Sequence, residues 1–184
     1  APRLSFFFNI GMNFFMEIAK LRAARRLWAR IMRERFGVTD VRSQWCRIHA
    51  QTSGVSLTRK EPMNNIVRVA LQCLAAMLGG AQSIHTNSYD EVFSTPTEKA
   101  LKIAMRTQQI VQEESEITNW VDPLGGSWLV ESITDRLERD AWEEIESIER
   151  LGGMEAAVES YYPQRSIHAN AVHDQKDVES GERK

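Results

Sequence analysis

Polar side chains that could hold a ligand accompany three short apolar stretches. Residues 81–91 (AQSIHTNSYDE) predict a short strand over 81–86 that runs into a turn of Asn, Ser and Asp. Residues 4–9 (LSFFFN) and 46–54 (CRIHAQTSG) repeat this design. The candidate residues are Arg3, Ser5, His49, Gln51, Gln82, His85, Asn87 and Glu91. With one carboxylate and one guanidinium among mostly neutral groups, they suit holding a phosphate-bearing ligand or shielding a reactive intermediate better than hydrolysis.

A structural interpretation competes with this one. A lone His near a strand end is more often a hydrogen-bonded scaffold residue than a catalyst, and Asn or Gln there often satisfies loop backbone. The site hypothesis depends on three consecutive units placing polar groups at the same end of a sheet. No nucleotide-binding, hydrolase or metalloprotease motif occurs, and His168 and His173 are five apart, so we expect no metal site.

Composition limits the class of protein. The 184 residues are 42% hydrophobic and 26% charged with a net charge of -2, which indicates a soluble domain and argues against a nucleic-acid surface. No apolar run approaches the roughly 20 residues of a membrane span. Cys46 and Cys73 are expected to be reduced, buried thiols of a cytoplasmic protein. The chain begins Ala-Pro-Arg without Met, and we expect a piece of something longer.

Helical periodicity separates the predicted strands. Apolar positions predict an amphipathic helix over about 12–36 and a broadly buried one over 66–78, with Thr58 or Asn64 as its cap. Thr95 is expected to cap a third helix that runs to about residue 114, with Glu98 at its third position. The resulting β-α-β-α-β-α order predicts parallel strands. The seven basic residues of the first helix are interpreted as a solvated face, an anionic partner being the alternative.

The remainder is predicted to be helical. Residues 120–127 (WVDPLGGS) read as an irregular linker, and the next helix stops at Gly152-Gly153. A short helix over 154–161 follows, and from Gln175 the chain reads as a polar, exposed end. These patterns predict two parts: residues 1–117 with three β/α units, and residues 118–184 with a helical segment and a polar tail.

Four segments in this order and spacing resemble the catalytic subunit of methylmalonyl-CoA mutase and its acyl-CoA mutase relatives. They are PRLSFFFNIGMNFFMEIAKLRAARRLWA, RIHAQTSG-SLT, GGAQSIHTNSYDE and VDPLGGSWLVE. The resemblance covers practically the whole chain. It implies the last three β/α units of a TIM (β/α)8 barrel and the helical segment that follows. In such enzymes coenzyme A threads the barrel axis, and cobalt–carbon homolysis in adenosylcobalamin starts a radical 1,2-rearrangement of the acyl group.

The resemblance also implies roles for individual residues. Arg3 is implied to contact phosphate, and Phe7 to lie beside the thioester tail. The implied coenzyme A channel positions are Arg3, Ser5, Phe7, His49, Gln51 and Gln82. The implied adenosylcobalamin positions are Gly54, Asn87, Glu91 and Ser94. Where mitochondrial-type sequences have Trp after TSG, this chain has Val55, which changes a large contact to the corrin.

Parts of the family's machinery have no counterpart in this sequence. The acid/base His belongs to the earlier barrel half, so no catalytic residue is assigned here, and the cobalt ligand belongs to a cobalamin-binding domain or subunit. The implied partners are an acyl-CoA, the remaining barrel half and that cobalamin domain, and the chain alone is expected to be inactive. The resemblance leaves open which acyl-CoA is the substrate. The alternative is a non-catalytic helical interaction module or an inactive remnant of such a mutase.

Overall fold

The computed structural model describes residues 2–182, which divide into two compact units between Glu138 and Arg139. The first unit holds the sheet and its helices, and the second holds the end of α4 with α5 and α6. The elements are β1 (Phe6–Ile10), α1 (Phe14–Glu34), η1 (Val41–Gln44), β2 (Ile48–Thr52), η2 (Gly54–Ser56), α2 (Asn64–Leu78), β3 (Ser83–His85), α3 (Glu98–Gln109), η3 (Ile110–Glu114), η4 (Ile117–Asn119), α4 (Trp128–Arg150), α5 (Met154–Glu159) and α6 (Tyr162–Ser180).

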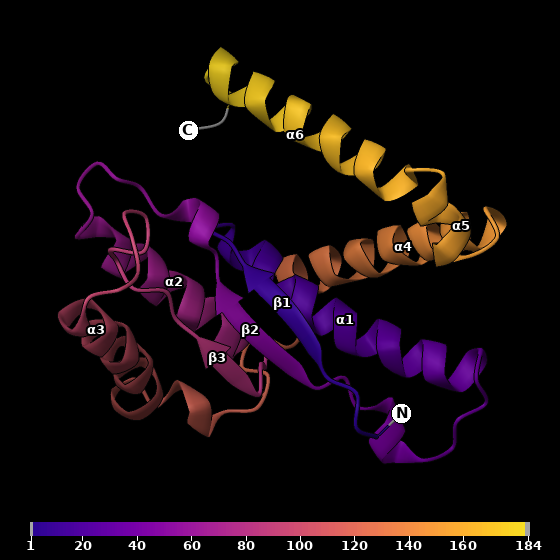
Figure 1. The fold of residues 1–184 in the computed structure, drawn as a ribbon. Coiled ribbons are helices and arrows are strands. Elements are labelled where there is room, and N and C mark those ends of the chain that lie inside the picture. Colours follow the sequence, from indigo (N-terminus) through magenta and orange to yellow (C-terminus); the bar gives the residue numbers. More distant parts are fainter. Residues whose placement is uncertain (1, 183–184) are drawn as a thin grey trace. The chain divides into compact units, whose positions relative to one another are not determined.

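The three strands form one parallel sheet in the order β1-β2-β3, as the alternation of strands and helices predicts (Figure 1). β1 begins two residues later than its expected range, and β2 and β3 are shorter than theirs. In the register, Phe7 lies opposite His49 and His49 opposite Ser83. Side chains alternate between the two faces of a strand, so this register decides which residues share a face.

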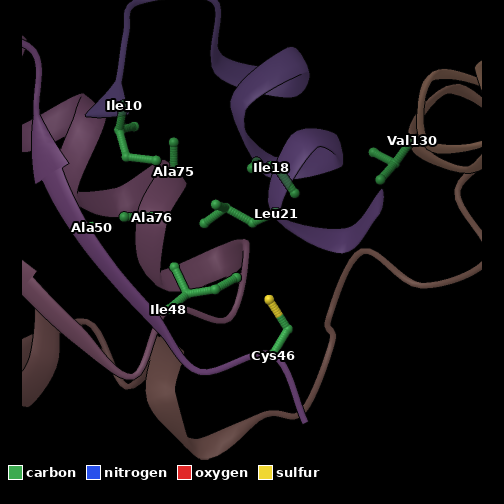
Figure 2. Packing of buried hydrophobic residues seen from close by; sticks show 9 residues of the cluster. All are labelled: Ile10, Ile18, Leu21, Cys46, Ile48, Ala50, Ala75, Ala76 and Val130. Carbon is green, nitrogen blue, oxygen red and sulfur yellow. The ribbon is translucent and has the colours of Figure 1, made fainter. Parts of the chain in front are cut away.

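The helices cover one face of the sheet. Ile10, Ile48 and Ala50 point from the strands into a core that is completed by α1, α2 and the first turns of α4 (Figure 2). Ile48 is only 1% exposed. The other members of this core are Ile18, Leu21, Cys46, Ala75, Ala76 and Val130. The helix side of the sheet is therefore apolar, and its opposite face carries the polar strand residues.

The basic surface of α1 has an internal partner, which neither interpretation of the sequence anticipated. Arg22 donates to both carboxylate oxygens of Asp122 at 3.1 and 3.0 Å and to Glu131 Oε1 at 2.8 Å. Arg26 pairs with Asp135 at 2.6 Å and with Glu138. The linker and the start of α4 are thus clamped to α1 by charge-assisted bonds rather than left to solvent.

Two helix starts differ from the predicted ones. The cap of α3 is Thr97 instead of Thr95, and its side chain accepts from the Ala100 N–H. Asp90 explains the shift, because its Oδ2 accepts from the Thr97 N–H and hydroxyl at 3.0 and 2.8 Å and fixes the chain there. Glu98 is consequently the first residue of α3 rather than the third.

Neither Thr58 nor Asn64 caps α2, which begins after Met63 without a side-chain cap. The neighbouring Asn65 is fully buried, and its amide nitrogen donates to the carbonyl oxygens of Thr58 and Tyr89 at 2.9 and 3.0 Å. It therefore ties the loop before α2 to the loop after β3.

Residues 175–182, near the end of the chain, are exposed apart from half-buried Asp177, as predicted. The structure adds that α6 continues through Ser180, so residues 175–180 are helical. These residues are polar except for Val178 and contain no Gly or Pro, and the helix ends where Gly181 adopts a positive φ of 79°. Across the described residues, none of the helices is long and apolar enough to span a bilayer.

Candidate functional site

We call the face of the sheet away from the helices the open face. It carries two rows of side chains that run across the strands. The first row joins Phe7, His49 and Ser83, and the second joins Asn9, Gln51 and His85. These residues are exposed or half-buried, whereas their strand neighbours face the core. Phe7, His49, Gln51 and His85 were predicted site residues. Asn9 and Ser83 were missed, although period-two alternation from Phe7 and His85 would have found both.

The first row is held together by direct contacts. The Ser83 hydroxyl lies 2.7 Å from His49 Nδ1. The Phe7 ring packs on the imidazole with ring centroids 5.4 Å apart and planes tilted by 46°. The imidazole is therefore fixed at Nδ1 and along one side, while Phe7 keeps a large apolar surface on the open face.

Beyond the carboxyl ends of the strands, Asn87 joins the loops after β2 and β3. Its N–H donates to Thr52 Oγ1 at 2.9 Å, and Asn87 itself is buried. In one orientation its amide donates to the Thr52 carbonyl at 3.1 Å and accepts from the Gly54 N–H at 3.2 Å; in the other it accepts from Gln51 at 3.4 Å. Gly54 and Asn87, two predicted cofactor positions, are thus neighbours.

The turn after β3 presents the other two predicted cofactor positions. Glu91 Oε1 accepts from the Ser88 N–H at 2.9 Å, so one carboxylate oxygen closes the turn. The exposed Ser94 hydroxyl donates to the Thr95 carbonyl at 3.2 Å. Buried Asn65 supports this turn through Tyr89, so the loop has a rigid base.

The opposite end of the sheet holds the remaining candidates, which corrects the expectation that all polar groups gather at one end. Arg3 and Ser5 precede β1, and Gln82 precedes β3. The Gln82 side chain continues the hydrogen bonding between β2 and β3. Its Oε1 accepts from the Ile48 N–H at 2.6 Å, and its Nε2 donates to the Gly80 carbonyl at 2.8 Å. Arg47, which donates to the Pro2 carbonyl at this end, was also missed.

A cavity lies before the amino ends of β2 and β3 and includes few candidate residues. This cavity of about 440 Å³ is lined by Arg25, Gln44, Trp45, Cys46, Arg47 and Gln82. Burial lowers the pKa of Arg25 and raises the pKa values of Cys46 and Cys73 to about 11. Both cysteines are buried and free, as predicted, and stay protonated at neutral pH. Within residues 2–182, no three His, Cys, Asp or Glu side chains gather as metal ligands would.

The sheet and its helices form a parallel α/β segment whose open face carries polar and aromatic side chains along the strand direction. The family model for methylmalonyl-CoA mutase matches residues 1–184, and the chain belongs to this family. It is 53% identical over 182 residues to methylmalonyl-CoA mutase of Rhizobium meliloti, covering 99% of this chain and 25% of that protein. Against the Escherichia coli enzyme the identity is 48% over 183 residues, covering 100% and 26% of the two chains.

The mitochondrial methylmalonyl-CoA mutase of Homo sapiens is 49% identical over 181 residues, covering 98% of this chain and 24% of that protein. The chain therefore spans about a quarter of the length of the curated relatives it matches. These relatives bear the name of an isomerase, an intramolecular transferase. The resemblance seen in the four sequence segments is confirmed at the level of the family.

Proposed function

We propose that the chain is a segment of a coenzyme-B12-dependent acyl-CoA mutase and forms the last three β/α units of its (β/α)8 barrel over residues 1–117. Residues 118–184 would form the helical segment after the barrel. The observation that carries the proposal is the open face of the sheet. A barrel interior lies on the side away from the helices, and here that side is lined by polar and aromatic residues instead of the branched aliphatic layers of a filled barrel.

Coenzyme A would run along this face in the strand direction. Arg3 and Ser5, before β1, suit the phosphate end, because a guanidinium binds phosphate through charge-assisted hydrogen bonds. Phe7, His49 and Gln51 lie further along and suit the pantetheine and acyl end. Gln82 lies at the phosphate end, where its amide already holds backbone groups, so its contribution would be to shape the channel.

The residues beyond the carboxyl ends of the strands fit a corrin ring and its adenosyl group. Gly54 presents bare backbone, and an added Cβ there would lie 3.2 Å from Asn87 Nδ2. Val55 is 96% exposed and offers an apolar surface of the kind a flat macrocycle covers. Glu91 keeps acceptor capacity for ribose hydroxyls, with Asn87 and Ser94 beside the same mouth. When bound, adenosylcobalamin supplies radical chemistry through cobalt–carbon homolysis.

The rest of the machinery would come from other parts of the protein or from partners. The acid/base His, the earlier barrel half and the cobalt ligand have no counterpart among these residues, and the acyl-CoA would be methylmalonyl-CoA or a related ester. The 184 residues alone should show no turnover with adenosylcobalamin and methylmalonyl-CoA. Rearranged product from the purified chain would contradict the proposed division of labour.

Two substitutions in the complete mutase test the two ends of the site. Glu91→Gln should weaken adenosylcobalamin binding by about tenfold, because charge-assisted hydrogen bonds contribute about 1.5–3 kcal/mol and the amide retains one acceptor. Arg3→Ala should instead raise the KM for the CoA ester and spare the cofactor. Titrations of each variant with each ligand separate the two effects. Loss of acyl-CoA binding alone in Glu91→Gln would show that the wrong ligand has been placed at this mouth.

A further inference from the structure

His49 lies at the centre of the open face, in the middle strand of the sheet. Its Nδ1 lies 2.7 Å from the Ser83 hydroxyl of β3, and its ring rests against Phe7 of β1. Both neighbours occupy the same row of the register, so the backbone pairing itself brings the three side chains together. The imidazole is oriented by this row, and Ser83 is the member that can exchange a hydrogen bond with it.

The direction of that hydrogen bond decides what His49 can do. A neutral imidazole has one N–H donor and one acceptor nitrogen, and a partner at one nitrogen selects the role of the other. A serine hydroxyl can donate or accept, so the ligand at Nε2 settles the direction. The thioester carbonyl oxygen of an acyl-CoA can only accept, and it requires an N–H at Nε2. Nδ1 must then accept, and Ser83 must donate.

We propose that Ser83 is a positioning residue, whose hydroxyl donates a hydrogen bond to His49 Nδ1 when an acyl-CoA is bound and so holds the imidazole with Nε2–H directed at an acyl-CoA carbonyl oxygen. This inference rests on the proposed function, which places the acyl end of coenzyme A beside His49. Ser83 itself need not touch the substrate. Without its hydroxyl, the imidazole loses the donor that pairs with Nδ1 when Nε2–H faces the ligand, and it can also turn about its χ2 angle.

Equilibrium binding in the complete mutase tests the role of Ser83. Methylmalonyl-CoA is titrated calorimetrically into the enzyme without adenosylcobalamin, so that no turnover occurs. Ser83→Ala should weaken binding by about 3- to 10-fold, the effect of one neutral hydrogen bond. Ser83→Thr keeps the hydroxyl and suits a strand, so it should bind within about 2-fold of the parent enzyme. Both variants should bind adenosylcobalamin as tightly as the parent.

A double-mutant cycle separates positioning from a direct contact. In a His49→Ala background, Ser83→Ala should change methylmalonyl-CoA affinity by less than about 2-fold, because the group that it positions is gone. An undiminished effect in that background overturns the inference, as does an unchanged affinity in Ser83→Ala while His49→Ala weakens binding. If His49→Ala and Arg3→Ala both leave affinity unchanged, the proposed function itself fails, and the inference with it.

Discussion

The two faces of the sheet are built from alternate residues of the same strands, yet different forces account for them. On the helix side, Ile48 and Ala50 are enclosed by α1 and α2, and hydrophobic burial explains their types. On the open face, their immediate neighbours His49 and Gln51 contact polar side chains of β3 and of the loop after it. Packing explains the first face completely and leaves the residue types of the second unexplained, which is the reason for assigning ligand contacts there.

Neighbouring substitutions in β2 give the sharpest test of this contrast. Ile48→Ala should lower the free energy of unfolding by about 2–5 kcal/mol, because it removes buried methyl groups and leaves a cavity. His49→Ala should cost less than about 1 kcal/mol, since the side chain faces the open side. Urea unfolding of the 184-residue chain, followed by circular dichroism, compares them. Equal losses would mean that the open face is a second structural core.

The ion pairs that clamp α1 to the start of α4 give the second test. Arg22→Ala should cost about 1–3 kcal/mol, because it removes charge-assisted bonds from two carboxylates and the bond from Nη1 to Thr134 Oγ1 at 3.2 Å. Arg33→Ala is the matched control on the same helix, where the guanidinium donates to the Ala29 carbonyl within an exposed turn. The same unfolding assay compares the pair, and similar losses would dismiss the clamp.

The start of α3 gives a smaller and very local contrast. Thr97→Ala should destabilise the chain by about 1 kcal/mol, the usual cost of losing an N-cap side chain. Thr95→Ala should stay within about 0.5 kcal/mol, because Thr95 does not cap the helix in the structure. Thermal midpoints of the two variants decide between the positions, and the reverse order would restore Thr95 as the cap.

The smallest expected effect is on the pH dependence of stability, through Glu131 in the clamp between α1 and α4. Hydrogen bonds from Arg22 and from the Gly126 N–H lower the pKa of Glu131 to about 2, from an ordinary value of 4.5. Because the folded-state pKa is the lower one, this stabilisation is complete above about pH 4.5 and is lost as the pH falls toward 2. Between pH 6 and 3, the thermal midpoint of Glu131→Gln should depend less on pH than that of the parent. An unchanged slope would assign the acid sensitivity to other carboxylates.

Periodicity predicted the succession of strands and long helices along the chain, because the spacing of apolar residues reflects which side meets the core. Periodicity did not predict the helix ends that are fixed by a side chain several residues away in the sequence. Asp90 moves the cap of α3 to Thr97, and buried Asn65 replaces a cap by bracing a loop. Contacts of this kind depend on the folded chain and leave no local signal.

The candidate site was predicted in its residues more than in its arrangement. His49, Gln51 and Asn87 stand out as polar groups near strand ends, and the structure brings Gln51 and Asn87 together. Ser83 and Asn9 lie within their strands, where alternation from His85 and Phe7 would have placed them on the open face. That Ser83 meets His49 depends on the inter-strand register, which a single strand does not reveal.

The last helix has a consequence for how the chain opens in solution. α6 has a Pro in its first turn and no buried residue along Tyr162–Ser180. A helix of this length without a packed face is marginal in water, so its amides should exchange with deuterium at free energies near zero. The β2 amides, beneath α1 and α2, should exchange only on global unfolding. Calorimetry of the chain would then measure melting of the sheet-bearing unit, with α6 already interconverting between helix and coil well below that transition.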